Sequence, residues 1–385
     1  MRRYDFLIIN RSFWPIYPVV GEALLSLAEK LVVNKKKVAV VTQNQLKNIK
    51  RNLNDSNRGK GVKFFTTWAF SVSSSNLLKR IFDSFFFMFL VLIVLIKTRP
   101  KKIYISTDPP ILVPFIVLLY SKISKTEYIY HLQDIHPEAT NTVIKVNSLL
   151  FKILKKIDNI TIRHASLLIT LNEQMKSEII NRSNTKKKII IIENPSVQLD
   201  KDLPKVKKKG ISFTGNLGRL QRIPLLIKSI KKYLQKGGQL EFVFAGGGFY
   251  SDQILKLSNY YPSIKYYGKV SSEQAAIISS SYEWALAPIE DEITHYAFPS
   301  KLATYVCTEA KILAICSEDT SVAGWIKKNK VGFVIKPTEE SLIDIFFKIE
   351  NNSLDSTSIN LDRSDLKKIL SMDKFVNNLK DIVLS

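Results

Sequence analysis

Short apolar segments separated by longer amphipathic stretches recur along the first half of the chain. The stretch after the first segment, residues 21–31, places Leu24, Leu27, Ala28 and Leu31 on one helical face. Strands that alternate with helices are typical of a parallel sheet with crossover helices. The pattern predicts strands over residues 6–9, 37–42, 62–66, 103–106, 128–132, 167–171 and 189–192.

The same alternation returns in the second half, where the pattern predicts strands over residues 211–214, 241–245, 284–288 and 312–315. The stretch after the first of these has an apolar face made of Ile223, Leu226, Ile227, Ile230 and Leu234. A chain of 385 residues exceeds one ordinary domain. The fold class is therefore predicted to be α/β, with two domains that each contain a parallel sheet.

A polar, lysine-rich segment over residues 201–210 separates the two halves. We predict an N-terminal domain over residues 1–196, a linker over 197–210 and a C-terminal domain over 211–362. The tail, residues 363–385, carries Phe375, Leu379, Ile382 and Val383 and is predicted to form a terminal helix.

Glycine turns follow two predicted strands of the C-terminal domain. The first strand ends at Gly215-Asn216, and the next one ends at Gly246-Gly247-Gly248. Glycine lets a backbone approach a ligand closely, and ligands of open α/β sheets bind at the carboxyl ends of the strands. These turns therefore predict a ligand site at this edge of the sheet.

Pro299-Ser300-Lys301 stands at the predicted start of a helix after the strand 284–288. A helix N-terminus favours negative charge, so a hydroxyl and a cation there form a suitable cradle for a diphosphate. An ordinary capped helix can carry the same residues. The motif gains weight from the two glycine turns that precede it.

Four motifs in this order resemble the retaining family-four glycosyltransferases, in particular a bacterial surface-polysaccharide branch that includes N-acetylfucosamine transferases. They are Gly215-Asn216-Leu217-Gly218, Ala245-Gly246-Gly247-Gly248, Tyr267-Gly268-Lys269-Val270 and Pro299-Ser300-Lys301-Leu302. The resemblance implies the GT-B fold, in which two Rossmann-like domains face each other across a cleft and the second holds the nucleotide-sugar. It also implies that the terminal helix packs back towards the N-terminal domain.

The resemblance makes Lys301 the first candidate for contact with the donor diphosphate and Arg219 the second, although either can be a solvated surface cation. Family members commonly carry Arg and Lys where this chain has Asn216 and Gln221. The donor-binding residues implied are Gly215, Asn216, Gln221, Gly246, Gly247, Gly248, Pro299, Ser300, Thr304 and Glu292.

The family also has paired glutamates, and this chain departs from that pattern. The second glutamate, which holds the ribose, corresponds to Thr304, and the first falls near Tyr296. The acidic turn Glu290-Asp291-Glu292 and the nearby His295 are all candidates to supply the missing acid. The sequence does not choose among them, and a solvated acidic turn explains the same residues.

In the N-terminal domain, the segment 131–138 follows a strand and resembles the family's cleft floor. Asp134 and Glu138 match catalytic positions there, while Gln133 replaces a common family histidine. The acceptor-side residues implied are Gly21, Glu22, His131 and His136.

The net charge of +23 is concentrated in one region. Residues 30–102 hold 16 basic against 2 acidic side chains, a net charge of +14, and they contain the apolar run 85–96. A membrane-spanning helix needs about 20 residues, so we expect no transmembrane span and no signal peptide. The combination predicts a peripheral protein on the inner face of the cell membrane, with an anionic membrane surface as partner. A core helix with solvated lysines is the competing interpretation.

The 2 cysteines have no metal or redox spacing, which favours a cytoplasmic setting, and no Asp-x-Asp metal motif follows a strand. The resemblance implies a retaining glycosyltransferase of surface-polysaccharide (O-antigen or capsule) synthesis, and the missing Asp-x-Asp motif leads us to expect it to be metal-independent. It would transfer an N-acetylated hexose or deoxyhexose to a polyprenyl-diphosphate-linked glycan. We expect no cofactor besides the nucleotide-sugar donor, and we expect that donor to be UDP-linked. We expect no nucleic-acid partner. A GT-B UDP-sugar epimerase, an inactive relative and a non-catalytic basic protein that binds nucleic acid or membranes are the alternatives.

Overall fold

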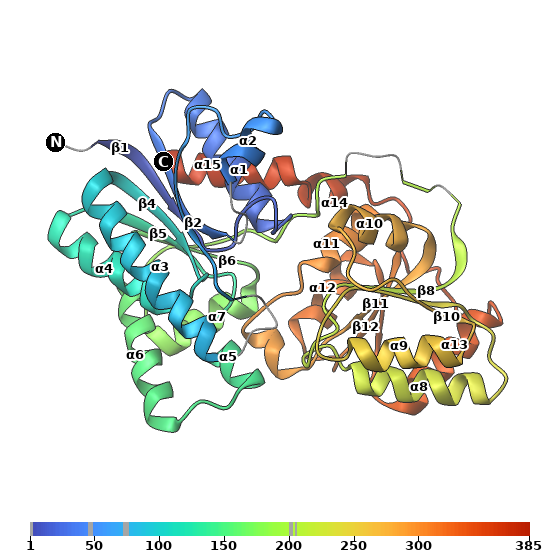
Figure 1. Cartoon of the computed structure of the whole chain (residues 1–385). Coiled ribbons are helices and arrows are strands. Elements are labelled where there is room, and N and C mark those ends of the chain that lie inside the picture. The colour runs from blue at the N-terminus through green and yellow to red at the C-terminus, as the bar shows by residue number, and fades with distance from the viewer. Residues whose placement is uncertain (1–2, 45–48, 72–76, 200–202, 205) are drawn as a thin grey trace. The chain divides into compact units, whose positions relative to one another are not determined.

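The computed structural model describes residues 3–44, 49–71, 77–199, 203–204 and 206–385. The chain divides into two compact units, each built around its own parallel sheet (Figure 1). Unit 1 comprises Met1–Glu193 and Met372–Ser385, and unit 2 comprises Asn194–Ser371.

The sheet of unit 1 has seven strands in the order β3-β2-β1-β4-β5-β6-β7, and every pair is parallel. The chain starts in the middle at β1, moves outward to β3, then crosses back to β4 on the other side. The strands are β1 (Tyr4–Ile9), β2 (Val38–Asn44), β3 (Lys63–Trp68), β4 (Pro100–Ser106), β5 (Glu127–His131), β6 (Leu167–Thr170) and β7 (Ile189–Ile191).

Helices cover this sheet because its central strands are nearly continuous apolar runs, which leave both faces hydrophobic. The helices of unit 1 are α1 (Val20–Val33), α2 (Ile49–Asp55), α3 (Leu77–Thr98), α4 (Leu112–Ser124), α5 (Glu138–Val143), α6 (Ser148–His164), α7 (Glu173–Ser183) and α15 (Met372–Leu384). The C-terminal helix α15 packs beside α1 and buries Phe375, Val376 and Leu379 in the same core as Leu24 and Leu27.

Helix α3 differs from the sequence expectation in its length. It has 22 residues, whereas the apolar run 85–96 is much shorter. Among the described residues, one helix, over Ile81–Thr98, is long and apolar enough to cross a membrane by length and composition alone. The helix is therefore longer than the apolar run indicated, and the expectation that it does not span a membrane stays a prediction. One side of the helix nevertheless packs inside unit 1, where Phe87, Val91 and Leu95 are buried.

The sheet of unit 2 has six parallel strands in the order β10-β9-β8-β11-β12-β13. Its strands are β8 (Lys208–Thr214), β9 (Phe242–Ala245), β10 (Ile264–Tyr266), β11 (Tyr282–Pro288), β12 (Lys311–Ile315) and β13 (Gly332–Ile335). Its helices are α8 (Ile223–Gln235), α9 (Ser251–Tyr260), α10 (Ser272–Ser280), α11 (Lys301–Cys307), α12 (Ser321–Asn329), α13 (Glu339–Glu350) and α14 (Ser364–Ile369), with a 3₁₀ turn, η1, over Glu292–His295.

The core of unit 2 includes an aromatic cluster where α8 and α13 pack on the sheet. The ring centroid of Tyr233 lies 5.8 Å from that of Phe242, 5.6 Å from that of Phe346 and 4.8 Å from that of Phe347. The hydroxyl of Tyr233 donates to Glu350 (2.6 Å), so this buried tyrosine has its polar atom satisfied.

Every predicted strand overlaps an observed strand, which confirms the α/β class with two parallel sheets. The boundaries shift slightly. Unit 2 begins at Asn194, because Ser196 donates its N–H to the Leu370 carbonyl (2.8 Å). The chain returns to unit 1 at Met372 rather than at residue 363, since α14 packs against α11 within unit 2.

Candidate functional site

The sheet of unit 2 has a topological switch point between β8 and β11. These strands are neighbours, but the chain runs from β8 to β9 on one side and from β11 to β12 on the other. The connections that leave their carboxyl ends therefore diverge, and it is at this point that open α/β sheets bind ligands. The loops are the Gly215 turn after β8 and the segment 289–300 after β11.

Gly215 and Gly246 meet at this edge of the sheet. Gly215 donates its N–H to the Ala245 carbonyl (2.9 Å), and its φ of +126° suits glycine. A Cβ on Gly246 would lie 1.8 Å from the Gly215 carbonyl oxygen. Contact between two turns, rather than approach to a ligand, therefore requires glycine at position 246.

Close packing between the two turns also requires glycine at position 248. A Cβ there would lie 2.6 Å from the Leu217 backbone, and Leu217 donates its N–H to the Gly247 carbonyl (2.9 Å). At Gly247 the nearest atom to such a Cβ is 3.9 Å away, on Lys269. Of the three glycines predicted to bind the donor in this turn, Gly247 alone has room around its α-carbon.

Lys301, the first residue of α11, brings its ammonium to the Gly215 turn. Its Nζ lies 4.1 Å from the centroid of the Phe213 ring and 3.5 Å from where a Cβ of Gly215 would stand. The Nζ atom is buried, although the residue as a whole is half-buried, and it has no hydrogen-bond partner in the described part of the chain. Burial lowers the pKa of Lys301 to about 7. A buried ammonium without a counter-ion is costly and favours binding of an anion.

Tyr305, one turn further along α11, fixes this helix to the sheet. Its buried hydroxyl accepts from the Thr214 N–H (3.1 Å) and lies 3.2 Å from the Leu286 carbonyl. The hydroxyl thus joins the last residues of β8 and β11 to the helix that carries Lys301. We did not single out Tyr305 from the sequence; its helical spacing from Lys301 was the available signal.

The side chains of Asn216 and Gln221 converge over Gly218. A Cβ on Gly218 would lie 2.5 Å from Asn216 Nδ2 and 2.7 Å from Gln221 Oε1. The oxygen Oε1 of Gln221 is buried and has no hydrogen-bond partner among the described residues. After Lys301 Nζ, it is the second unsatisfied polar atom near the Gly215 turn, and it can accept a hydrogen bond from a ligand hydroxyl or amide.

Arg219 lies at the exposed rim of the same loop. Its guanidinium carbon is 4.2 Å from the centroid of the Phe249 ring, and that ring is 63% exposed. The stack holds a cation beside the Gly215 turn while leaving the guanidinium N–H groups in solvent.

The acidic turn after β11 is held mainly by Arg222. Its guanidinium pairs with Glu290 (3.0 Å) and Asp291 (2.9 Å), and Ser317 donates its N–H to Asp291 (2.9 Å). Burial raises the pKa of Glu290 above its ordinary value. Burial would also raise the pKa of Asp291, but the Ser317 hydrogen bonds and the Arg222 charge outweigh it and lower that pKa.

Glu292 is exposed and has no ion pair or hydrogen bond within the residues that the structure describes. Of the three carboxylates in the turn, it is therefore the one that remains available to a ligand. His295 is also exposed, with its ring 6.0 Å from that of Tyr296.

The remaining predicted donor residues lie at the start of α11. Pro299 is half-buried, and Ser300 is exposed at the N-cap without a capping hydrogen bond. Thr304 is 9% exposed, and its Oγ1 accepts from the Val197 N–H (3.4 Å). Its hydroxyl proton remains able to donate, but the weak contact ties it to the chain segment before β8.

Unit 1 has its own switch point, between β1 and β4. Asp108 joins the loops that leave these strands, since it pairs with Arg11 (3.1 Å) and accepts from the Ser12 N–H (2.7 Å). Asp134 lies nearby, with its N–H donated to Thr107 Oγ1 (3.3 Å). Burial, with a contribution from the Asp108 carboxylate, raises the pKa of Asp134 to about 6. A carboxyl group with such a pKa can exchange a proton near neutral pH.

Glu138 belongs to a buried ion network. It pairs with Arg182 and with Lys155 (2.9 Å), while Arg182 also pairs with Asp158. Tyr130 donates to Asp158 (2.9 Å), which links the network to β5. Glu138 thus fixes the segment that carries Asp134, a structural contact that the sequence did not reveal.

The two histidines of this segment are already bonded within unit 1. His131 is fully buried, with Nδ1 2.5 Å from the Tyr104 hydroxyl and Nε2 3.3 Å from Gln133, and burial lowers its pKa to about 3. It is therefore a neutral core histidine and does not exchange protons near neutral pH. His136 pairs through Nδ1 with Thr140 (2.9 Å).

Gly21 and Glu22 open α1. A Cβ on Gly21 would lie 2.5 Å from the Trp14 backbone nitrogen, so close packing of the preceding loop requires glycine. Glu22 pairs with Arg58 (2.7 Å) and accepts from Ser26 (2.9 Å). Both predicted acceptor-side residues therefore have structural roles at this turn.

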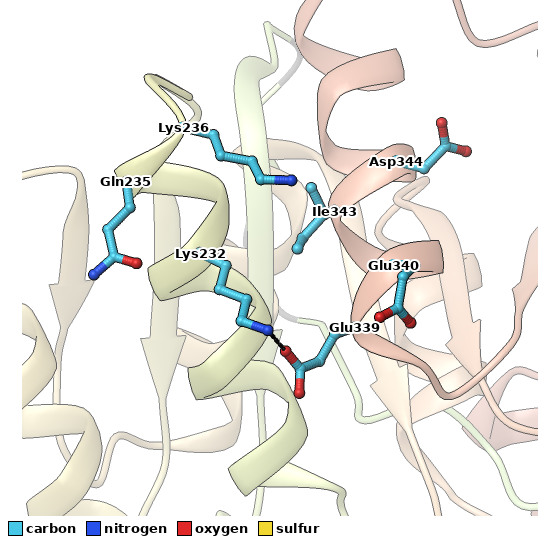
Figure 2. Close-up of a pocket in the computed structure, with 7 residues that line it drawn as sticks. All are labelled: Lys232, Gln235, Lys236, Glu339, Glu340, Ile343 and Asp344. Carbon is cyan, nitrogen blue, oxygen red and sulfur yellow. Dashed lines mark ion pairs between the residues drawn. The ribbon is translucent and has the colours of Figure 1, made fainter.

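A groove of about 470 Å³ lies on the helical layer of unit 2, between α8 and α13 (Figure 2). Lys232 pairs there with Glu339, which Lys228 also contacts, so its central charges are already compensated. None of the predicted site residues lines it. Among the described residues, no cluster of His, Cys, Asp and Glu side chains is arranged to hold a metal ion.

No family model matches the chain, and no curated protein matches it. Among solved structures it is similar to sucrose-phosphate synthase from Thermosynechococcus elongatus, with a TM-score of 0.74 and 12% identity over 99% of this chain and 98% of that chain. It is similar to WaaG, a glycosyltransferase involved in lipopolysaccharide biosynthesis (TM-score 0.68, 11% identity, 98% and 99% covered). It is also similar to HepE from Anabaena, solved in complex with UDP (TM-score 0.63, 15% identity, 98% and 99% covered). The two parallel α/β units and these similarities give the chain the GT-B fold, as the resemblance implied.

Proposed function

We propose that this protein is a glycosyltransferase that moves a sugar from a nucleotide-diphosphate donor to a glycan acceptor. The observation that carries the proposal is the ammonium of Lys301, buried and without a partner among the described residues, at the switch point of unit 2. Glycosyltransferases of known structure share the fold, and one similar protein was solved with UDP. We therefore propose a UDP-linked donor.

In the proposed reaction, the bond between the anomeric carbon and the diphosphate oxygen breaks, and a bond from that carbon to an acceptor oxygen forms. Negative charge develops on the leaving diphosphate. Lys301 stabilises that charge, and its buried setting strengthens the interaction because little water screens it. Binding the diphosphate in turn keeps the ammonium protonated.

The acceptor hydroxyl loses its proton in this reaction, and a retaining front-face transfer can deliver that proton to the leaving diphosphate. The proposal thus needs no histidine base, which agrees with the neutral, buried His131. Asp134, with a pKa of about 6, is the side chain in unit 1 that we propose to orient the acceptor hydroxyl. The reaction is proposed to proceed without a divalent metal.

Other residues of the loop are proposed to fix the donor. Gln221 offers a buried acceptor atom, Oε1, to a donor hydroxyl or amide. Glu292 is exposed and can accept from a sugar hydroxyl, and Arg219 can reach phosphate oxygens from the rim. Thr304 is the proposed ribose contact in place of the family glutamate.

The sugar and pathway rest on the sequence resemblance. We propose an N-acetylated hexose or deoxyhexose as the sugar and a polyprenyl-diphosphate-linked glycan as the acceptor, in the synthesis of a surface polysaccharide such as O-antigen or capsule. The similarity to WaaG, whose described role is in lipopolysaccharide biosynthesis, agrees with this pathway class.

The test is incubation of the purified protein with radiolabelled UDP-sugars and a membrane-lipid extract, followed by counting label in the organic phase. Transfer of label to lipid, with retention of the anomeric configuration by NMR, supports the proposal. Lys301→Met should lower the rate by at least a hundredfold. Lys311→Met is the matched control, because Lys311 also lies over an aromatic ring (Trp284, 5.3 Å) but at the opposite end of the sheet.

Two outcomes would count against the proposal. Conversion of the UDP-sugar without any acceptor would indicate an epimerase instead. Equal activity of the Lys301→Met and Lys311→Met variants would show that the diphosphate binds elsewhere.

A further inference from the structure

The outward side of α3 carries large apolar side chains at helical spacing from Ile81 to Ile96. Phe82 is 61% exposed, Phe89 59% and Ile93 61%. We call this surface, which also includes Ile81, Phe85 and Phe86, the outer face of α3. Monomeric soluble domains rarely expose such a continuous apolar strip without a partner for it.

The apolar surface continues beyond the helix. Phe70, 55% exposed, packs edge-on against Phe82 and Phe86, with ring centroids 6.1 Å apart in both pairs. Helix α4 packs alongside α3 and adds Ile123, which is 87% exposed (Figure 1). Phenylalanine and leucine are common on the apolar face of helices that lie in the membrane–water interface.

Positive charge accompanies this surface. Residues 64–126 hold 8 basic against 2 acidic side chains, a net charge of +6. The two acids are engaged within unit 1, since buried Asp83 accepts from the Phe70 and Ser71 N–H groups and Asp108 pairs with Arg11.

Four exposed cations lie at one end of this layer, and a fifth, Lys79, lies at the start of α3. Lys97 lies in the last turn of α3 and Arg99 directly follows it, while Lys122 lies in the last turn of α4 and Lys125 is its C-cap. Because α3 and α4 are both crossover helices of the same parallel sheet, they run in the same direction, so these ends are adjacent. An apolar strip beside a cationic rim is complementary to an anionic lipid surface.

Helix α3 cannot cross a bilayer while unit 1 stays folded. Its 22 residues span about 33 Å, enough to reach across the hydrocarbon core. Its inner side, however, is buried against the sheet, and Asp83 anchors its first turns to the preceding loop. The helix therefore offers the membrane one side only, which suits a helix lying in the plane of the interface.

We propose that the outer face of α3 docks unit 1 on the surface of an anionic membrane. A second copy of the chain is a poorer occupant, because a two-fold interface would place the same net-positive surface of both copies face to face. The inner face of the cell membrane, with its anionic lipids, is the surface that fits. This binding does not require catalysis, so it can be tested separately from the proposed function.

The test is sedimentation of the full-length protein with vesicles of phosphatidylcholine alone or mixed with phosphatidylglycerol. We expect binding to the anionic vesicles and loss of binding at about 1 M salt. Each phenylalanine that leaves water raises the membrane affinity about tenfold, so the Phe82→Ser/Phe89→Ser variant should bind about a hundredfold more weakly. The Lys97→Glu/Lys122→Glu variant should bind the anionic vesicles at least tenfold more weakly than the wild type.

Matched controls lie on unit 2. Tyr260→Ser with Leu361→Ser removes two apolar side chains that are 76% and 78% exposed, and Lys236→Glu with Lys328→Glu reverses two exposed lysines. These variants should bind vesicles as the wild type does. Thermal melts should show that all variants fold, since each altered side chain is exposed.

Three results would overturn the proposal. Equal binding to neutral and anionic vesicles is one, and unchanged binding of the Phe82→Ser/Phe89→Ser variant is another. The third is a dimer in light scattering that this variant converts to a monomer, which would make the outer face of α3 an interface between copies.

Discussion

Donor affinity should depend on pH through Lys301. The pKa of this side chain in the free protein is about 7, because burial disfavours its charged form. A UDP-sugar keeps both diphosphate charges between pH 6 and pH 9, so any change of affinity in this range comes from a titrating group of the protein. Only the protonated ammonium attracts the diphosphate, and once bound the diphosphate holds the proton in place.

The magnitude follows from the fraction of protein in the competent state. With a pKa of about 7, Lys301 is about nine-tenths protonated at pH 6 and about one-thirtieth protonated at pH 8.5. The apparent Kd is the intrinsic value divided by that fraction. It should therefore rise about thirtyfold between these two pH values.

Isothermal titration calorimetry with UDP-N-acetylglucosamine as the probe can measure this change. Lys301→Arg should remove the pH dependence, because arginine stays charged throughout the range. Lys301→Met should bind weakly at every pH, while Lys311→Met should keep the wild-type slope. A wild-type Kd that is constant with pH, or a slope that survives Lys301→Arg, would refute the reasoning.

The same pKa predicts how stability changes without ligand. Below pH 7, Lys301 is charged in both the folded and the unfolded chain, so the folded state bears the whole cost of burying the charge. Between pH 7 and the ordinary lysine pKa of 10.5, the unfolded chain binds more protons than the folded one, and stability should rise with pH. Lys301→Met should lack this rise in thermal melts.

Three further predictions concern packing, the ion network and metals. Gly246→Ala should lower the free energy of unfolding in urea by at least ~2 kcal/mol, because its Cβ would lie 1.8 Å from the Gly215 oxygen. Gly247→Ala, whose Cβ would lie 3.9 Å from its nearest atom, should lower it by less than ~1 kcal/mol. Equal losses would contradict the turn contact. Arg182→Met should destabilise the protein by about 3–5 kcal/mol, since it leaves buried carboxylates uncompensated, and a loss below ~1 kcal/mol would show that Glu138 does not depend on it. Transfer activity should survive EDTA, and a loss that magnesium or manganese restores would show that a metal takes part.

The strand pattern of the sequence was sufficient to predict the two parallel sheets. Long apolar strands such as β1 and β11 are buried on both faces, so their composition identifies them. The short edge strands β10 and β13 were not predicted, because β10 contains Lys265 and β13 begins at Gly332, whereas the similarly short edge strand β7 is entirely isoleucine.

The position of the candidate site in the fold could be predicted from the sequence, but the contacts of its side chains could not. The Gly215 turn and Lys301 were predicted from a glycine turn after a strand, a Pro-Ser-Lys helix start and the family resemblance, and the observed strand order brings their loops together. The partners of Glu138, Asp291 and Thr304 lie far away in sequence, so no local spacing reveals that other contacts already engage these side chains. Burial of the Lys301 ammonium is likewise a property of packing.

A crystal structure of the protein soaked with UDP would test the central claim most directly. We predict that a β-phosphate oxygen lies within hydrogen-bond distance of Lys301 Nζ, beside the Gly215 turn at the switch point of unit 2. A diphosphate bound elsewhere, for example by Lys232 and Lys236 in the groove between α8 and α13, would contradict it.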